Sequence, residues 1–326
     1  MKKIIYSPGE PAGIGPDLII KLSASNIWEN FKIPIVTIGD PNLFLDRAKK
    51  LKKKIKVIEL NSVNEVKKNK KAYLQIIKVS KCKNTSPGKL TKLNANYVLD
   101  VLDYAIKQTI SDKCAALVTG PLNKETIISI DQKFTGHTEY IQKITRSKDV
   151  LMMLASNKLK VALATTHIPL KMVSKNITKK LIVNKVQILN KDLKNKFNIK
   201  KPNIKVLGLN PHAGENGKIG NEELQYIKPA IKILRKSKIN VSMPISADTA
   251  FSEKILKETD AYLGMYHDQV LIPFKMKNKF DGLNITIGKK IIRLSPDHGT
   301  GKELIKKPKF INNQSFLSCV KFCEKY

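Results

Sequence analysis

The sequence predicts an α/β fold of about two domains, built on a mainly parallel sheet, and three features of the chain support this prediction. Short apolar runs typical of strands alternate with longer stretches in which apolar residues recur at helical spacing. Turns rich in Gly, Pro and Asp separate these segments. With 326 residues the chain is too long for one small core, so about two domains are expected. Strand–helix alternation of this kind places helices on the faces of a sheet whose strands run mainly parallel.

The individual elements follow from these patterns in chain order. Lys3–Tyr6 reads as the first strand and Ser7–Gly15 as a glycine- and proline-rich turn. Pro16 suits the first turn of a helix, where no backbone N–H is needed, and Asp17–Leu22 continues that helix. Between Leu90 and Ile110, apolar side chains fall on one helical face. Further strands are predicted at Ile35–Ile38, Ala115–Val118, Val161–Thr165, Ile204–Leu209, Val241–Ile245, Ala261–Met265 and Ile291–Leu294, and further helices at Lys179–Phe197 and Glu222–Lys236.

The charge of the chain suggests nucleic-acid binding, but its composition argues against this interpretation. The formal net charge is +33, and clustered cations bind phosphate backbones by releasing counterions. Of the 60 basic residues, however, 56 are Lys and only 4 are Arg, and aromatic residues make up only 6%. Nucleic-acid readers favour Arg for bidentate contacts. Runs such as Lys49–Lys56 and Lys67–Lys71 are therefore interpreted as solvated faces that bind polyanions weakly at low salt, and a basic nucleic-acid-binding protein is only a distant alternative.

Targeting and redox features indicate a cytoplasmic protein. The N-terminal apolar run is far shorter than a signal-peptide core, and no segment approaches the roughly 18 apolar residues that span a bilayer. The cysteines Cys82, Cys114, Cys319 and Cys323 form no C-x-x-C pair. We therefore expect buried thiols rather than disulfides, and no membrane partner.

All five histidines lie in short segments rich in Gly, Pro, Asp, Thr and Asn, and three of them could meet. His167, His212 and His267 are too far apart in sequence to form a ligand pair on one helix. Each follows or adjoins a predicted strand, and the C-terminal ends of parallel strands gather at one edge of a sheet. Three neutral imidazoles with an open position suit a divalent transition metal such as Zn or Co. A single histidine of this kind would be better explained as a surface or satisfied core residue, but five in similar segments favour an active site.

Two carboxylates accompany these histidines. Asp248 follows Ile245-Ser-Ala, and Asp268 directly follows His267. Either carboxylate could orient a metal-bound imidazole, accept a proton or complete a coordination shell. A helix N-cap explains Asp248 about as well as a catalytic role does.

Anion-binding candidates lie towards the C-terminus. Lys275, Asn284 and Arg293 could bind a phosphate or carboxylate, and Arg293 carries most weight because arginine is scarce here. The glycine-rich segments Gly9–Gly15 and Gly299–Gly301 could cradle phosphates with backbone N–H groups. Neither matches G-x-G-x-x-G or G-x-x-x-x-G-K-[ST], so a standard Rossmann dinucleotide site is not supported.

Nine ordered blocks across nearly the whole chain resemble the 4-hydroxythreonine-4-phosphate dehydrogenase family of pyridoxal phosphate biosynthesis. Chance agreement over so many blocks in the same order is very improbable. The blocks are Gly9-Glu-Pro-Ala-Gly-Ile-Gly-Pro16, Gly39-Asp-Pro41, Val118-Thr-Gly-Pro-Leu-Asn-Lys124, Thr135-Gly-His-Thr-Glu139, Thr165-Thr-His167, Asn210-Pro-His-Ala-Gly-Glu215, Ser246-Ala-Asp-Thr249, Met265-Tyr-His-Asp-Gln269 and Asp297-His-Gly-Thr-Gly301.

The resemblance implies a two-domain α/β fold like that of isocitrate and isopropylmalate dehydrogenases, with the cleft between domains at a homodimer interface. The first domain would comprise 1–130 and 270–326, and the second 131–269. The implied cofactors are NAD or NADP and one divalent ion, Zn, Mg or Co. The family's site residues carry over residue by residue. The implied metal ligands are His167, His212 and His267, and the implied catalytic carboxylates are Asp248 and Asp268. The implied substrate contacts are His137, Thr138, Lys275, Asn284 and Arg293, and the implied cofactor contacts are His298, Gly299 and Thr300.

The implied reaction is oxidation of 4-phosphooxy-L-threonine at its C3 hydroxyl, followed by decarboxylation to 3-amino-2-oxopropyl phosphate. A divalent ion would lower the pKa of that hydroxyl and polarise the carbonyl that replaces it. A related dehydrogenase of a phosphorylated sugar acid, such as threonate or erythronate 4-phosphate, is the main alternative. One departure concerns the cofactor. In the wider group of decarboxylating dehydrogenases, an Ala-Asp segment that helps to bind the adenosine follows this His-Gly loop, whereas here His298 is followed by Gly-Thr-Gly-Lys-Glu-Leu. The choice between NAD and NADP therefore stays open.

Overall fold

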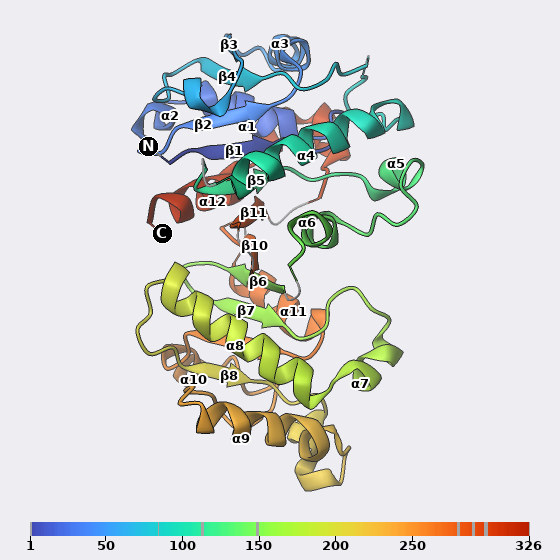
Figure 1. Ribbon diagram of the computed structural model, residues 1–326, viewed down its shortest axis with the longest axis vertical. Helices are drawn as coiled ribbons and strands as arrows, with labels where there is room; N and C mark the ends of the chain where they lie inside the picture. Colours follow the sequence, from blue (N-terminus) through green and yellow to red (C-terminus); the bar gives the residue numbers. More distant parts are fainter. Residues whose placement is uncertain are drawn as a thin grey trace. The chain divides into compact units, whose positions relative to one another are not determined.

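The α/β class is confirmed in a computed structural model, which describes residues 2–83, 85–111, 114–147, 150–278, 281–288, 291–296 and 299–325. The chain forms two compact units (Figure 1). Unit 1 comprises Met1–Arg146 and Lys290–Lys325, and unit 2 comprises Ser147–Lys289. These limits differ from the predicted 131–269 because α6 (His137–Thr145) packs on α4 (Ala95–Ile110) in unit 1, whereas α11 (His267–Lys277) packs on strands of unit 2.

The described strands of unit 1 form a wholly parallel sheet in the order β3-β4-β2-β1-β5-β11. The centre of this sheet is shielded from solvent, since Ile4, Ile5 and Tyr6 of β1 are completely buried. The edge strand β3 is instead largely exposed and starts at a lysine, which discourages pairing with another chain. The strands are β1 (Ile4–Ser7), β2 (Ile35–Ile38), β3 (Lys56–Leu60), β4 (Tyr73–Ile77), β5 (Ala116–Thr119) and β11 (Arg293–Pro296).

Helices cover the sheet of unit 1 through their apolar sides. In α4 the buried residues Val98, Val101, Leu102 and Ala105 recur at helical spacing and contact β1 and β5, along which the helix runs in Figure 1. The other helices are α1 (Gly15–Ser23), α2 (Ile27–Asn30), α3 (Pro41–Lys50), α5 (Lys124–Ile128), α6 and α12 (Gln314–Lys325), with short 3₁₀ turns at Val63–Glu65, Lys92–Asn94, Lys302–Lys306 and Pro308–Phe310.

The sheet of unit 2 has the order β10-β6-β7-β9-β8 among the described residues. The pairs β10–β6 and β6–β7 are antiparallel, whereas β7, β9 and β8 run parallel. The C-terminal ends of these three strands therefore lie at one edge, as the sequence predicted. The strands are β6 (Leu151–Ala155), β7 (Lys160–Leu163), β8 (Ile204–Val206), β9 (Ala261–Gly264) and β10 (Leu283–Ile287).

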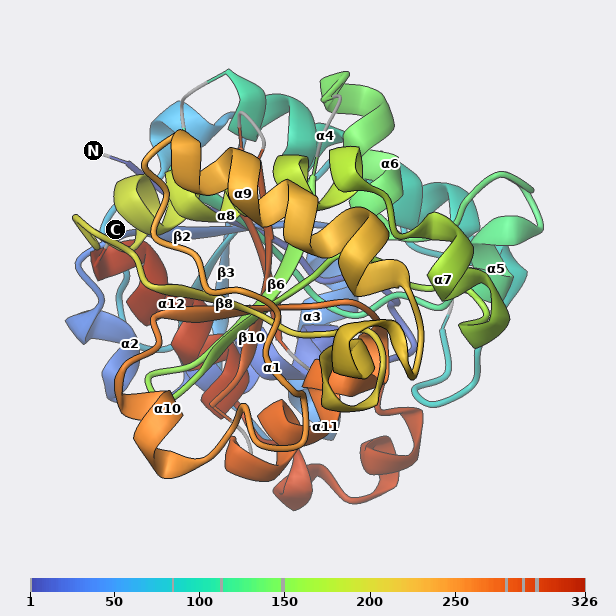
Figure 2. The same ribbon diagram turned by 90° about the horizontal axis from the view of Figure 1, so that it is seen from below.

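The helices of unit 2 lie against this sheet and against one another. Helix α8 (Lys179–Lys196) contacts β6 and β10, and α9 (Lys228–Lys236) lies beside α8 (Figure 2). Within the part of the chain that is described, no helix is long and apolar enough to cross a membrane. The remaining helices are α7 (Val173–Asn176), α10 (Glu253–Lys257) and α11, with a 3₁₀ turn at Leu170–Met172, a turn at Pro211–Gly217 and a π-helical turn at Glu223–Ile227.

Two predicted elements were wrong in detail. The segment Val241–Ile245 is not a strand: only isolated bridges join Val241 to Ile204 and Ile245 to Leu207. Pro244 within it has no N–H to donate to a ladder. The predicted helix Glu222–Lys236 begins instead with the π-helical turn, and its α-helical part starts at Lys228.

Candidate functional site

The ends of β7 and β9 bring His167 and His267 together. Beyond the paired strands, Ala164 N–H donates to Gly264 O at 2.8 Å, and Thr165 donates from Oγ1 to Met265 O at 2.6 Å. These bonds carry the parallel alignment to the two histidine-bearing loops. The ring centroids of His167 and His267 are 5.7 Å apart at an interplanar angle of 45°. Two imidazoles 100 residues apart in sequence therefore share one edge of the sheet.

His267 is held by its own helix and by the carboxylate beside it. It begins α11, whose buried Val270 and Phe274 belong to the core of unit 2. Its Nδ1 lies 2.6 Å from Asp268 Oδ1. With Nδ1–H donating to that carboxylate, the Nε2 lone pair is free to bind a cation. Asp268 thus lies within hydrogen-bonding distance of the imidazole that it was predicted to orient, and its role stays a prediction.

His212 follows β8 at the same edge but adopts an unusual backbone. Leu207 N–H donates to Leu263 O at 3.0 Å, which keeps the chain after β8 beside β9. His212 then has φ 51° and ψ 30°, and its side chain is exposed. Among the described His, Cys, Asp and Glu residues, no group of three is close enough to hold a metal ion. The sheet thus collects the three loops at one edge, but within one chain only His167 and His267 are shown as an adjoining pair.

Asp248 is exposed and lies near His212. Ser246 Oγ donates to its Oδ1 at 2.5 Å, and this bond, supported by the nearby His212, lowers the pKa of the carboxyl. The alternative role as a helix N-cap is not seen, because α10 begins at Glu253 with Ser252 as its N-cap. An ionised, hydrogen-bonded Asp248 is suited to accept a hydrogen bond rather than to donate a proton.

The two anion-binding candidates of unit 2 differ in environment. Lys275 is an exposed residue of α11. Asn284 lies on β10 opposite Leu154, and its buried Oδ1 has no hydrogen-bond partner among the described residues. A buried amide oxygen without a partner is costly, and a polar ligand group would satisfy it.

In unit 1, the guanidinium of Arg293 lies close enough to His137 for its charge to act on the ring. Arg293 is 5% exposed, and its Nε and Nη2 donate to Thr119 Oγ1 at 3.0 and 2.8 Å. No ion pair joins it to a carboxylate of the described residues. Burial lowers its pKa to about 10, so the guanidinium stays charged at neutral pH. A buried guanidinium with no carboxylate ion pair among the described residues favours an anionic ligand.

His137 and Thr138 open α6, where backbone N–H groups face outward. Lys124, which was not among the predicted site residues, lies beside them. A Cβ on Gly136 would be 3.8 Å from Lys124 Nζ, and the charges of Arg293 and Lys124 both act on the His137 ring. The block Val118–Lys124 was part of the family resemblance, but no role was assigned to Lys124 from the sequence.

The pKa of His137 predicts a pH dependence of stability. Burial, and then the charges of Arg293 and Lys124, lower this pKa well below its usual value. Between that pKa and about 6.5 the unfolded chain binds more protons than the folded chain, so stability falls as the pH falls through this window. We expect this group to contribute up to about 1.4 kcal/mol per pH unit. Urea unfolding between about pH 5 and about pH 7 should show a shallower slope for His137→Gln, and an unchanged slope would contradict a neutral, half-buried imidazole.

The glycine-rich segments of unit 1 pack together. Ile14 N–H donates to Thr300 O at 3.0 Å, so the segment Gly299–Gly301 lies on the segment Gly9–Gly15. A Cβ on Gly15 would be 1.9 Å from Pro8 O, which excludes any other residue there. Asp297 and His298 lie outside the described residues.

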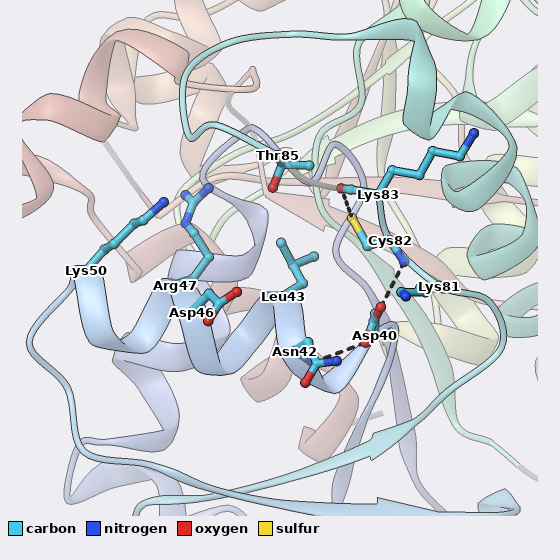
Figure 3. Close-up of a pocket in the computed structure, with 10 residues that line it drawn as sticks. All are labelled: Asp40, Asn42, Leu43, Asp46, Arg47, Lys50, Lys81, Cys82, Lys83 and Thr85. Carbon is cyan, nitrogen blue, oxygen red and sulfur yellow. Dashed lines mark hydrogen bonds between the residues drawn. The ribbon is translucent and has the colours of Figure 1, made fainter.

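A cavity of about 360 Å³ lies elsewhere in unit 1, against α3 (Figure 3). None of the predicted site residues lines it. Burial, followed by the charges of Asp40 and Glu10, raises the pKa of Cys82 to about 12, so the thiol is protonated and is not an activated nucleophile. The lining residues are Asp40, Asn42, Leu43, Asp46, Arg47, Lys50, Lys81, Cys82, Lys83 and Thr85.

Comparison with known proteins gives a consistent result. The model of the family described as pyridoxal phosphate biosynthetic protein PdxA matches residues 30–323. A 4-hydroxythreonine-4-phosphate dehydrogenase from Pseudoalteromonas translucida (strain TAC 125) is 44% identical over 302 residues, which are 93% of this chain and 90% of the relative. One from Vibrio parahaemolyticus serotype O3:K6 (strain RIMD 2210633) is 43% identical over 305 residues, 93% and 91% of the two chains.

Solved structures agree with these relatives. The crystal structure of 4-hydroxythreonine-4-phosphate dehydrogenase from Klebsiella pneumoniae is similar with a TM-score of 0.88 and 29% identity, covering 100% of this chain and 99% of that one. That from Burkholderia phymatum has a TM-score of 0.84 at 29% identity, covering 99% and 98%. A terephthalate 1,2-cis-dihydrodiol dehydrogenase from Burkholderia xenovorans LB400 shares the fold at 20% identity, with a TM-score of 0.67 and coverage of 99% and 97%.

Proposed function

The chain belongs to the PdxA family of pyridoxal phosphate biosynthetic proteins, and from this premise we propose that it oxidises 4-phosphooxy-L-threonine at C3 with NAD or NADP. Loss of CO₂ from the resulting β-keto acid then gives 3-amino-2-oxopropyl phosphate. As a member of this family the chain is an oxidoreductase, and the family suggests a nicotinamide cofactor and a divalent metal. The observation that carries the proposal is the adjoining pair of imidazoles, His167 and His267, at the ends of neighbouring parallel strands.

The imidazole pair fits a divalent cation such as Zn, Mg or Co. The ring separation allows both nitrogens to approach one ion, and Asp268 leaves His267 Nε2 free for it. When bound, such a cation supplies Lewis acidity toward the C3 hydroxyl and toward the carbonyl that replaces it. Asp248 would accept a hydrogen bond from a polar group of the substrate, which its lowered pKa supports.

We propose that the chain forms a homodimer, in which His212 of a second copy supplies the third imidazole of the metal site. Two observations support this. No third ligand joins His167 and His267 among the described residues, while His212 is exposed on its own turn. Large apolar side chains also lie exposed on the elements that carry the two histidines: Leu170 is 70% exposed three residues after His167, and Met276 is 79% exposed near the C-terminal end of α11. A second copy of the chain would cover these side chains.

Three side chains of unit 1 would hold an anionic end of the substrate. Arg293, Lys124 and the neutral His137 offer two positive charges and a ring N–H, which balance a phosphate dianion. Thr138 of unit 1 is proposed as a further neutral donor. In unit 2, Lys275 is proposed as a cationic donor, and the Asn284 oxygen, which has no partner among the described residues, suits an ammonium or hydroxyl group. His298, Gly299 and Thr300 would contact the nicotinamide cofactor, which supplies the hydride acceptor.

The direct test is reduction of NAD or NADP by the protein with 4-phosphooxy-L-threonine, followed by absorbance. We expect turnover with added divalent metal and its loss on chelation. Parallel assays with threonate 4-phosphate and erythronate 4-phosphate distinguish this activity from that of a sugar-acid phosphate dehydrogenase. No cofactor reduction by 4-phosphooxy-L-threonine under any metal condition would refute the proposal.

A substrate-truncation experiment tests the role of Lys124. We expect Lys124→Met to lower kcat/KM for 4-phosphooxy-L-threonine about 10- to 100-fold, because a charge-assisted contact to phosphate is lost. With unphosphorylated 4-hydroxy-L-threonine the same substitution should change little. Lys133→Met, at another exposed lysine of unit 1, is the control and should leave both values unchanged. Equal losses with both substrates would show that Lys124 does not contact the phosphate.

A further inference from the structure

The turn that carries His212 is held in a costly conformation. His212, Ala213, Glu215 and Asn216 have φ between 44° and 55°, the left-handed region that residues other than glycine rarely adopt. Such a residue is strained and persists only where its surroundings impose the conformation. Something outside the turn must therefore fix it.

The carboxylate of Glu223 binds the residues that lead into this turn. Its side chain is 1% exposed, and its Oε1 accepts hydrogen bonds from the N–H groups of Leu209 and Asn210 at 2.7 and 2.8 Å. Its Oε2 accepts a bond from Asn210 Nδ2 at 2.9 Å. The carboxylate also fills the space beside Gly214, where a Cβ would be 2.6 Å from Oε2. Three donors before His212 and a close-fitting glycine two residues after it thus hold the backbone on both sides of this histidine.

Glu222 ties the same turn to the segment that follows His167. Its Oε2 accepts a bond from Asn210 Nδ2 at 2.8 Å, and its Oε1 accepts one from Ser174 Oγ at 2.5 Å. These bonds lower the pKa of Glu222 and keep it ionised. Ser174 lies on α7, seven residues after His167 by number. Asn210 therefore donates to both carboxylates, and the two histidine-bearing segments are joined through them.

The local backbone is adapted to this arrangement. Glu223 opens the π-helical turn Glu223–Ile227, and Glu222 directly precedes it. A π-helical turn inserts an extra residue into a helix and often occurs at functional sites. Here it lets two consecutive glutamates direct their carboxylates to one asparagine.

We propose that Glu223 is a positioning residue for His212, with Glu222 as its support, and that the pair preorganises the imidazole for the divalent cation. The inference rests on the proposed metal site and names residues that act through His212 without touching the ion. A purely structural role is the alternative. It would lower the stability of the metal-free protein without changing metal affinity.

The test measures Co²⁺ binding to the full-length, metal-free protein by titration calorimetry and by the Co²⁺ absorption spectrum. Glu223→Gln keeps the size of the side chain but loses an acceptor, so we expect Co²⁺ affinity to fall about 10- to 100-fold. Glu222→Gln should have a smaller effect in the same direction. Glu253→Gln, an exposed glutamate of α10, is the control and should bind Co²⁺ like the wild type. Urea unfolding of each metal-free variant measures any loss of stability separately.

The possible outcomes separate the two proposals. If the wild type binds no Co²⁺, the proposed metal site fails. If the wild type binds Co²⁺ and Glu223→Gln binds it equally well with the same spectrum, the positioning role fails. Should Glu223→Gln not fold, Asn210→Ala removes the donor shared by both carboxylates and is expected to weaken Co²⁺ binding as well. Unchanged binding in Asn210→Ala would then overturn the inference.

Discussion

His267→Ala is expected to reduce turnover of 4-phosphooxy-L-threonine by at least about 10³-fold, and His167→Ala by a similar factor. A Lewis acid at the reacting oxygen contributes several kcal/mol, and each 1.36 kcal/mol corresponds to about a tenfold rate change. The two ring centroids are 5.7 Å apart, so removing either imidazole would leave the proposed cation with one ligand fewer from this chain. Initial rates at saturating metal, with bound metal measured by atomic absorption, check the expectation.

Asp268→Asn is the matched control for the loss of His267. It keeps the imidazole and changes only the group that holds Nδ1 at 2.6 Å. We expect a loss of metal affinity of about 10- to 100-fold, and most of the turnover should return at high metal concentration. If His267→Ala retained wild-type turnover and metal content, His267 would not be a metal ligand.

Arg47→Met is expected to destabilise the protein by about 3–5 kcal/mol, because it leaves Asp17 buried without its partner. Arg47 is 3% exposed and Asp17 1%. The guanidinium donates from Nε to Oδ1 at 2.8 Å and from Nη2 to Oδ2 at 2.6 Å. It also donates to Pro11 O and Gly13 O, so the segment Gly9–Gly15 should loosen when it is lost. Urea unfolding in the absence of ligand measures the free energy change.

The surface pair Lys49–Asp46 provides the control for this prediction. Its atoms are 4.0 Å apart and its side chains are 82% and 70% exposed, so solvent screens the attraction. Lys49→Met should change the free energy of unfolding by no more than about 0.5 kcal/mol. Equal effects of the two substitutions would mean that burial does not set the strength of the Arg47 pair.

Much of the fold was predictable because its signals are local. Ile35–Ile38 was predicted as a strand and forms β2 with the same bounds, and Lys179–Phe197 was predicted as a helix and forms α8 to within one residue. Edge strand β3 was not predicted, since its lysine-rich surroundings were interpreted as a solvated face. An exposed edge strand lacks the continuous apolar pattern that separates a buried strand from a loop. The backbone hydrogen bonds that define β3 are made with β4, a segment further along the chain.

The candidate site was predictable only in part. His167, His212 and His267 were chosen because they follow strands, and the parallel order β7-β9-β8 brings their loops to one edge. Spacing could not show that only the first and last adjoin within the chain, nor that His212 lies in a left-handed turn. Glu223 gave no signal at all, because an acidic residue at the start of a helical pattern is ordinary. Its role depends on contacts with Leu209 and Asn210 across a turn.

The sequence alone determined the fold class, the family and the residue types of the site, because periodicity, turn residues and ordered blocks are properties of neighbouring positions. Only the tertiary structure decided which of these residues meet. The pairing of β7 with β9 placed His167 beside His267. Folding likewise placed the buried Arg47 against Asp17, which is 30 residues away in sequence. Strand order and the burial of charge are settled by competition among the contacts of the whole folded chain, and no local pattern records that outcome.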